Sequence, residues 1–252
     1  MKRYLVWLLP LALAGCDLDL TGLGSCEYDR EFDDWLGVSG TDNVRVIAEA
    51  GDLRVQGRRG LTQVRVHARV CAEDLSDLDD AEVIIERVGS TISVLSLAPG
   101  RSVSRGRVDL WLEVPDWMLV GVDHEAGDIE VVDVAGASIY DDSGDIRLDR
   151  ILGDVEINDG SGDLWLDEIA GDVWLFDESG SIDVREVSGG VEVAVDGSGD
   201  LWIRDVDDDV YIGEDGSGNI LVENVGGDLT VIFDDSGSIT YRNVYGQVHL
   251  PR

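Results

Sequence analysis

The stretch SGDLWLDEIAGDVWLFDE (161–178) determines the fold of this chain. Leu164 and Leu166 alternate with polar or outward residues, and Ile169 follows as a third apolar position. A Gly-Asp turn then leads into a second alternating segment with Val173 and Leu175. Alternation with a period of two is typical of a half-buried strand. The stretch therefore predicts strand, turn, strand, turn, without a helical segment.

The same unit recurs along the C-terminal half of the chain. Its Ser-Gly pair stands at Ser143-Gly144, Ser161-Gly162, Ser179-Gly180, Ser198-Gly199, Ser217-Gly218 and Ser236-Gly237, with spacings of 18, 18, 19, 19 and 19 residues. A fixed short period indicates a stacked repeat architecture. The change from 18 to 19 has a local origin, because Val193 to Asp196 is three residues where Ile157 to Asp159 is two. We expect the second strand to gain one residue there, with the first strand unchanged.

Two such short strands cannot bury their apolar sides alone, but they can when each coil lies on the next, about 4.8 Å away. We therefore predict an all-β fold, a single-stranded β-solenoid with two short strands per coil of 18–19 residues. The regular coils occupy 126–252, and GDIEVVDVAGASIYD from Gly127 is a coil one residue short. Residues 41–125 form a less regular β-sheet part, in which VRVIAEAGDLRVQG from Val44 repeats the Gly-Asp-strand form.

The N-terminus has the features of an export signal. Lys2 and Arg3 precede a short apolar run, which is too short to span a bilayer, and Leu13-Ala14-Gly15-Cys16 follows. This ending resembles a bacterial lipobox, which implies a lipoprotein signal peptide at 1–15, lipidation at Cys16 and a tether over 16–40. The alternative is an ordinary signal peptide with a chance cysteine. Either way we expect an exported protein, and with the lipid it is anchored to a membrane of the cell envelope.

Two further cysteines, Cys26 and Cys71, suit one disulfide in an exported chain, and two free thiols are the alternative.

The formal charge is −34, from 19 Lys and Arg against 53 Asp and Glu. Such a charge argues against nucleic acid as a partner and suits cations or basic partners.

Alignment of the coils reveals two acidic columns. An aspartate stands two residues before every Ser-Gly pair, and a polar residue stands one residue after it. The nine aspartates of these columns are Asp141, Asp145, Asp159, Asp163, Asp177, Asp196, Asp200, Asp215 and Asp234. Stacked carboxylates could bind calcium. Alternatively, each aspartate accepts backbone N–H groups of its own turn, and glycine supplies the positive φ.

Outward positions of the strands carry aromatic residues on alternate coils. Trp165 and Trp202 occupy the first strand, and Trp174 and Tyr211 the second. They could stack on a glycan or anchor a protein partner. The alternative is strand propensity and pairing between coils.

No metal cluster, nucleophile elbow, phosphate loop or dinucleotide motif occurs in the sequence, and the turns after residue 143 are short. We therefore expect no enzyme and no cofactor other than calcium.

The last strand, QVHLPR, has few residues that would prevent another strand from pairing with its edge, only Pro251 and Arg252. Either that end is weakly protected or a partner adds strands there.

The segment VDLWLEVPDWMLVGVDHEAGDIEV (108–131) and the Gly-Asp-strand repeats after it resemble the bacterial "putative adhesin" family of the DUF4097 type. The resemblance covers roughly 41–252, and Ala126 stands where the family's first coil has serine. It implies a β-strand-repeat protein of the envelope. We predict a non-enzymatic, adhesin-like binding or scaffolding lipoprotein. A calcium-dependent structural or sensing module and a polysaccharide-acting β-helix enzyme are the alternatives.

Overall fold

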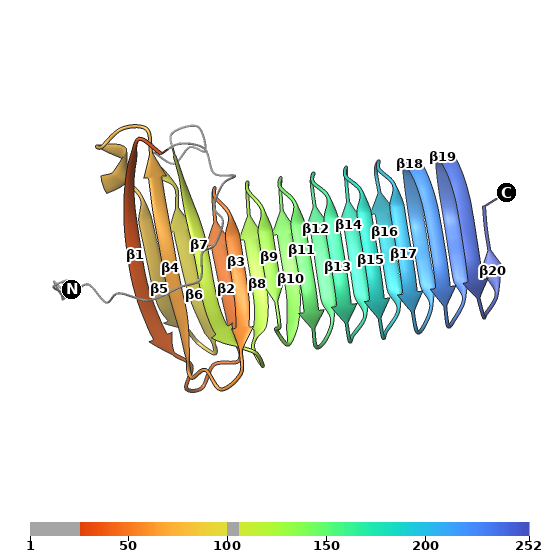
Figure 1. Ribbon diagram of the computed structural model, residues 1–252, viewed down its shortest axis with the longest axis horizontal. Coiled ribbons are helices and arrows are strands. Elements are labelled where there is room, and N and C mark those ends of the chain that lie inside the picture. The colour runs from red at the N-terminus through yellow and green to blue at the C-terminus, as the bar shows by residue number, and fades with distance from the viewer. Residues whose placement is uncertain (1–25, 100–105, 252) are drawn as a thin grey trace, which may run out of the picture.

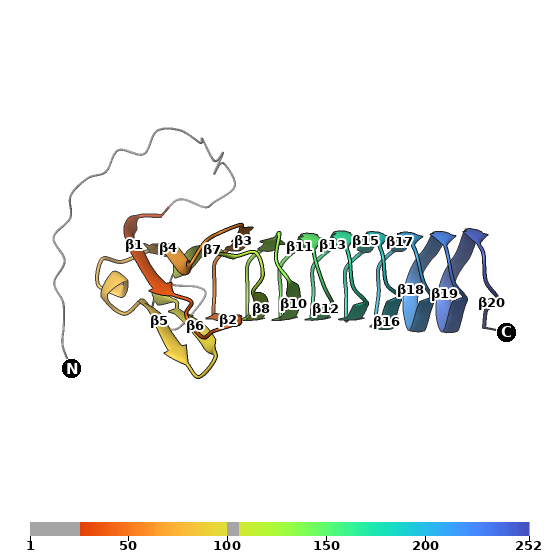
Figure 2. The ribbon, with the colours of Figure 1, turned by 90° about the horizontal axis from the view of Figure 1, so that it is seen from below.

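A computed structural model describes residues 26–99 and 106–251. The chain winds into an elongated stack of two sheets that face each other across one apolar core (Figures 1 and 2). The predicted all-β solenoid with a less regular N-terminal part is confirmed. The predicted signal peptide (1–15) and the lipidation residue Cys16 lie outside the described residues.

The first sheet contains the first strand of each coil, and most of its strands are parallel. In spatial order it consists of β1 (Tyr28–Gly37), β4 (Gln63–Ala72), β7 (Gly106–Pro115), β3 (Leu53–Arg58), β9 (Ile129–Val132), β11 (Ile146–Ile151), β13 (Leu164–Ile169), β15 (Ile182–Val187) and β17 (Leu201–Val206). β1, β4 and β7 pair antiparallel and form its N-terminal end.

The second sheet lies opposite the first. It consists of β5 (Glu82–Val88), β6 (Thr91–Leu97), β2 (Asn43–Ala48), β8 (Leu119–His124), β10 (Gly136–Asp141), β12 (Val155–Asp159), β14 (Val173–Asp177) and β16 (Val191–Asp196). Only β5 and β6 pair antiparallel. The long strands β18 (Val210–Val225) and β19 (Leu229–Val244) each pass through both sheets, and β20 (Val248–His249) ends the second. A short 3₁₀ helix, Asp77–Asp79, precedes β5.

The order of the coils in space differs from their order along the chain. β2 and β3 lie between the pair β6 and β7 and the pair β8 and β9, so residues 43–58 are enclosed by coils that come later in sequence. The antiparallel strands β1, β4 and β5 then cover the N-terminal end of the stack (Figure 1). Within the predicted tether (16–40), β1 pairs with β4 along its whole length.

Cys26 and Cys71 are joined by a disulfide, with their Cα atoms 5.3 Å apart. It fixes the start of β1 to β4, so the segment before the solenoid belongs to the folded body. No helix among the described residues is long and apolar enough to cross a membrane.

In the regular coils, from β11 to β17, the penultimate residue of the first strand is left-handed, which explains the third apolar position of the repeat. Arg150, Glu168, Glu186 and Asp205 have φ between +54° and +60°. This conformation bends the chain so that the next residue, such as Ile151 or Ile169, turns back into the core. The predicted extra residue in the second strand is also confirmed, since the register between β14 and β16 shifts at Leu175.

The glycine of each Ser-Gly pair is required by the stacking. Gly199 has φ +145°, and a Cβ added there would lie 1.7 Å from the carbonyl oxygen of Gly180 in the preceding coil. The same holds along the column from Gly144 to Gly237. Neighbouring coils therefore meet backbone to backbone at this turn, with hydrogen bonds such as Gly199 N–H to Ser217 O at 2.9 Å.

At the C-terminal end, β20 pairs with only Leu229 and Thr230 of β19. The remainder of this β19 edge has no strand partner among the described residues. A partner that adds strands there stays a prediction.

Candidate binding groove

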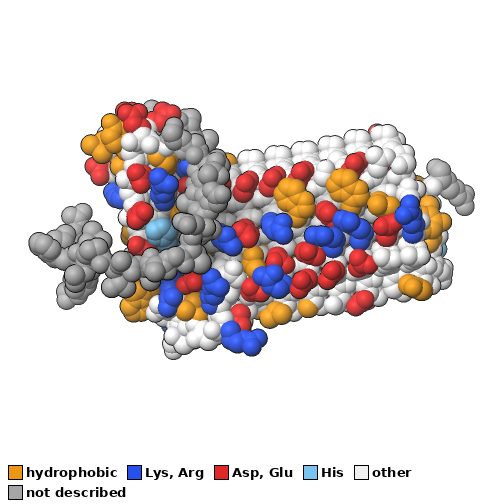
Figure 3. All heavy atoms as spheres, in the orientation of Figure 1, with side chains coloured by type: hydrophobic (Ala, Val, Ile, Leu, Met, Phe, Trp, Pro, Cys, Tyr) orange, Lys and Arg blue, Asp and Glu red, His pale blue; other side chains and the backbone are white. Residues whose placement is uncertain are grey.

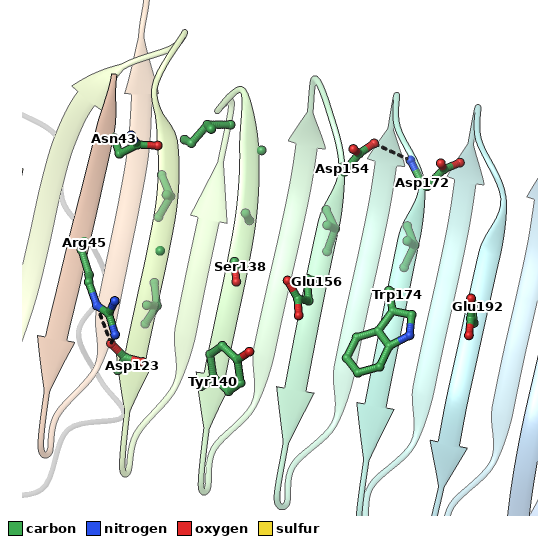
Figure 4. Close-up of a pocket in the computed structure, with 18 of the residues that line it drawn as sticks. Asn43, Arg45, Asp123, Ser138, Tyr140, Asp154, Glu156, Asp172, Trp174 and Glu192 are labelled. Carbon is green, nitrogen blue, oxygen red and sulfur yellow. Dashed lines mark hydrogen bonds and ion pairs between the residues drawn. The ribbon is translucent and has the colours of Figure 1, made fainter. Parts of the chain in front are cut away.

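The outer face of the second sheet carries a groove with a volume of about 1060 Å³. It follows a row of side chains that strand pairing brings into lateral register, one from each of seven neighbouring strands. From β2 to β18 the row reads Arg45, Gly121, Ser138, Glu156, Trp174, Glu192 and Tyr211. Because these residues alternate with buried core residues along each strand, the row faces away from the core. Figure 4 shows the part of this row from Arg45 to Glu192 across the strands.

The hollow part of the groove lies over Gly121 and Ser138, between Arg45 and Trp174. A Cβ added to Gly121 would make only ordinary van der Waals contact, with its nearest neighbour 3.9 Å away, so no neighbouring group crowds this position. Arg45 is held at the N-terminal side by Asp123, with 2.6 Å between guanidinium Nη2 and carboxylate Oδ2. Tyr140, which is 49% exposed, borders the hollow beside Ser138 (Figure 4).

A second line of carboxylates borders the groove at the start of the strands. The carboxylate of Asp154 accepts the backbone N–H of Asp172 at 3.0 Å, and Asp172 accepts that of Gly190 at 2.9 Å. The carboxylate of Asp209 likewise accepts the backbone N–H of Asp228 at 2.7 Å. Each bond joins one coil to the next, so these carboxylates fix the spacing of the strands that form the groove.

Of the aromatic residues that the sequence singles out, the structure brings Trp174 and Tyr211 together in the groove. Trp165 and Trp202 lie on the first sheet, on β13 and β17, where Asp183 of β15 stands between them. That face is rich in ion pairs, including Arg185 with Asp167 at 3.0 Å. Figure 3 shows rows of acidic and basic side chains that run along the stack among large hydrophobic ones. The four aromatics thus form two separate sites.

The aspartates two residues before Ser-Gly, Asp141 to Asp234, form the inner column. The turn interpretation holds for them only in part, since amides of their own turns act on Asp159, Asp177 and Asp196 but do not satisfy all of the carboxyl oxygens. Asp177 accepts the N–H of Ser179 at 3.1 Å, but both carboxyl oxygens of Asp159, Asp196 and Asp215 are buried without a hydrogen-bond partner among the described residues. These residues face inward at the corner of the stack, where the apolar core shields them from water.

Burial dominates the electrostatics of the inner column. Burial and then the carboxylates of Asp215 and Asp177 raise the pKa of Asp196 to about 8. Burial and then Asp177 raise the pKa of Asp159 to about 7. Burial likewise raises the pKa of Asp177 and that of Asp215 to about 6. Nearby backbone amides, such as that of Ser161 beside Asp159, lower these pKa values only in part.

The sequence analysis missed His124, which ends the inner column. Strand pairing places it opposite Asp141, and it is only 4% exposed. Its Nε2 lies 2.9 Å from the carbonyl oxygen of Gly51 and its Nδ1 lies 2.9 Å from Asp141 Oδ1. A carbonyl only accepts, so Nε2 carries a hydrogen and donates it to Gly51, and the second hydrogen bond joins Nδ1 to Asp141. The signal was available, since His124 precedes Gly127 by three residues as Asp141 precedes Gly144.

The polar residues one position after Ser-Gly, from Asp145 to Ser238, form the outer column. The turn interpretation names the wrong donor for these residues. Each carboxylate accepts a backbone N–H of the next coil and not of its own turn. Asp145 accepts that of Asp163 at 3.0 Å, and Asp200 accepts that of Asn219 at 2.9 Å. No group of three or more His, Cys, Asp or Glu side chains in the described part of the chain is arranged to hold a metal ion. The outer carboxylates therefore link each coil to the next.

No protein-family model matches the chain, and no curated protein matches it significantly. Among solved structures, it is similar to a "putative cell adhesion protein" of Clostridium sporogenes, with 12% identity over 89% of this chain and 99% of that one, at a TM-score of 0.39. A "putative adhesin" of Parabacteroides merdae shows 10% identity over 88% and 95%, at a TM-score of 0.41. A "putative adhesin" of Parabacteroides distasonis shows 13% identity over 88% of this chain and 97% of that one, at a TM-score of 0.32. No function is assigned to this chain from these similarities.

Proposed function

We propose that this chain is a non-enzymatic, adhesin-like binding module of the bacterial cell envelope, held to a membrane by a lipid on Cys16. The observation that carries the binding role is the groove on the second sheet. Trp174 and Tyr211 stand two coils apart on its face, in the same row as Gly121 and Ser138, whose small side chains leave the other part of the groove low. The core is filled by the residues that alternate with this row, so folding does not require aromatic side chains there.

The backbone below the groove is suited to rigid recognition. Its strands pair on both sides, and the carboxylates of Asp154, Asp172 and Asp209 fix adjacent coils. A site on paired strands is preorganised, so binding costs little ordering entropy. This supports recognition of a ligand by a fixed surface.

The groove supports binding better than polysaccharide cleavage. Glu156 and Glu192 stand on either side of Trp174, but both are exposed to water. Glycoside hydrolysis needs a carboxylic acid that burial keeps protonated next to the scissile bond. The short, uniform turns around these strands do not build the closed cleft that would supply this burial.

The binding role can be tested with fluorescently labelled protein on glycan and peptide arrays and on intact bacteria. Trp174→Ala should weaken binding about tenfold, as expected for loss of a central aromatic contact. Ser138→Trp should also abolish binding, because it fills the hollow. Trp202→Ala is the matched control, since it makes the same truncation on the opposite sheet. Equal binding by Trp174→Ala and the unchanged protein would contradict a role for the groove.

The anchor is tested separately. Cys16→Ser should abolish incorporation of labelled palmitate and move the protein out of the membrane fraction. A membrane-bound, palmitate-labelled Cys16→Ser protein would contradict lipidation at this residue.

A further inference from the structure

We propose that the groove binds an extended basic segment of a protein partner, with a cationic side chain at every third residue. This inference rests on the proposed binding role of the groove, and it adds the chemical class and the spacing of the ligand. It is argued from the charges, the aromatic side chains and the repeat distance of the groove.

The charge of the groove is strongly one-sided. Its lining includes six carboxylates, from Asp123, Asp154, Glu156, Asp172, Glu192 and Asp209, against the single arginine Arg45. Arg45 is already paired with Asp123. A cationic ligand therefore complements this surface, whereas an anionic ligand would be repelled.

Glu156 and Glu192 have no hydrogen-bond or ion-pair partner within the described residues. Carboxylates on the opposite sheet do have arginine partners. Asp183 contacts Arg204 at 2.5 Å, and Glu130 contacts Arg54 at 3.4 Å. The chain thus neutralises one sheet internally and leaves the groove carboxylates unneutralised. A partner that supplies cations gains the full attraction of these two carboxylates.

The aromatic residues of the groove lie where they would add to this attraction. Trp174 stands between Glu156 and Glu192 in the same row, one coil from each, which is about 4.8 Å. A guanidinium or ammonium group over the indole would make a cation–π contact and lie close to both carboxylates. Tyr211, which is 40% exposed, lies on the other side of Glu192 and offers a second ring next to that carboxylate, with Thr230 as its other neighbour in the row. A neutral sugar could stack on the rings but would leave the carboxylates without a counter-charge.

The spacing of these positions selects the conformation of the ligand. Trp174 and Tyr211 are two coils apart, which is about 9.6 Å. A polyproline II segment repeats every three residues, or about 9.3 Å, and places every third side chain on the same face. A β-strand would turn every third side chain to the opposite face. An extended ligand along the stack axis therefore meets both aromatic residues only in the polyproline II form.

The groove also sets where the basic part of the ligand lies. Arg45 stands at the N-terminal end of the row, beyond Gly121 and Ser138 (Figure 4). The two carboxylates without a partner among the described residues, Glu156 and Glu192, lie in the other part of the row. The cationic side chains should therefore lie over the part of the row from Glu156 to Tyr211.

The test uses fluorescence anisotropy with a fluorescein-labelled (Arg-Pro-Pro)₄ peptide and the purified protein. Two further peptides serve as references: (Gln-Pro-Pro)₄, which lacks the charge, and a peptide of four adjacent arginines followed by eight prolines, which changes only the spacing. We expect (Arg-Pro-Pro)₄ to bind most tightly, with an affinity that falls as salt rises. Equal binding of the two arginine peptides would refute the three-residue spacing.

Variants of the groove separate specific recognition from general attraction to an acidic protein. Glu156→Gln with Glu192→Gln should weaken binding about tenfold at low salt, from two- to fivefold for each exposed pair. Glu168→Gln with Glu186→Gln removes the same charge from exposed positions at the corner of the stack and should change binding less than twofold. Equal loss in both double variants would overturn the proposal, because the attraction would then come from the net charge alone.

The result also distinguishes this inference from the proposed function. If (Arg-Pro-Pro)₄ does not bind but Trp174→Ala abolishes the signal on a neutral glycan array, the basic ligand is wrong and the binding role stands. If Trp174→Ala changes neither signal, both are wrong.

Discussion

Replacement of Asp196 by asparagine should stabilise the protein at neutral pH and have little effect in mild acid. The carboxyl group of Asp196 is fully buried, both of its oxygens lack a hydrogen-bond partner among the described residues, and its pKa is raised to about 8. A carboxyl group whose pKa is higher in the folded state than in the unfolded state binds its proton more tightly when folded. Its contribution to stability is therefore complete below the unfolded pKa of about 4 and is lost as the pH rises toward 8.

The size of the effect follows from the interval between the two pKa values. Between the unfolded pKa and pH 7 lie about 3 pH units, and each unit corresponds to about 1.4 kcal/mol, so Asp196 alone would lower the free energy of unfolding by about 4 kcal/mol. Because Asp177 and Asp215 repel it, part of this loss is shared among neighbours. We expect Asp196→Asn to recover on the order of 2–4 kcal/mol at pH 7, which is a Tm increase of roughly 5–10 °C for a chain of this size.

The assay is thermal unfolding, followed by far-UV circular dichroism between pH 4 and pH 8. The unchanged protein should lose Tm steadily as the pH rises, and Asp196→Asn should flatten this dependence. Asp208→Asn is the control for net charge, because it removes one exposed negative charge at the opposite turn of the coil, away from the buried column. A Tm of the unchanged protein that does not fall between pH 4 and pH 8, or an Asp196→Asn protein less stable than the unchanged one at pH 7, would refute the buried acid column.

Three further predictions concern the stack itself. Gly199→Ala should destabilise the protein by about 3 kcal/mol or more in urea unfolding, because its Cβ would overlap the Gly180 carbonyl oxygen. Gly37→Ala is the control and should cost under about 1 kcal/mol, because no atom lies within 4 Å of its added Cβ. Cys26→Ser with Cys71→Ser should lower the free energy of unfolding by about 4 kcal/mol, the chain-entropy value for a loop of 45 residues, and hydrogen exchange should show faster opening in β1 than in β13. Calcium and a chelator should give the same Tm, because the outer carboxylates bind amides of the next coil and the inner ones are buried; a rise with calcium of several degrees would restore the cation hypothesis.

The repeat made the coils predictable. Its alternating apolar residues, its glycine and the extra residue before Asp196 each correspond to one feature of the structure. The position of residues 43–58 between later coils was not predictable, because parallel pairing over long sequence distances leaves no local signal. The inner aspartates were also misjudged. An acidic residue beside a Ser-Gly turn looks exposed in sequence, and only the stacking of coils shows that its side chain faces the core.

The groove was partly visible in the sequence. The outward alternation identified Trp174 and Tyr211, but it gave the same weight to Trp165 and Trp202. The difference between the two pairs lies in their neighbours. Pairing between strands places the carboxylates of Glu156 and Glu192, which have no partner in the described part of the chain, next to the first pair, and ion-paired side chains such as Asp183 next to the second. These neighbours come from different coils, so a single repeat does not reveal them.

The most direct test of the central claim, that the second sheet carries the binding surface, is site-specific photocrosslinking to the fluorescein-labelled (Arg-Pro-Pro)₄ peptide. The photoreactive residue p-benzoylphenylalanine would replace Thr230 on the outer face of the second sheet, next to Tyr211 in the row, or Thr240 on the first sheet. We predict a crosslinked product from position 230 that unlabelled peptide suppresses, and none from position 240. Equal crosslinking from both positions, or crosslinking from position 240 alone, would contradict the claim.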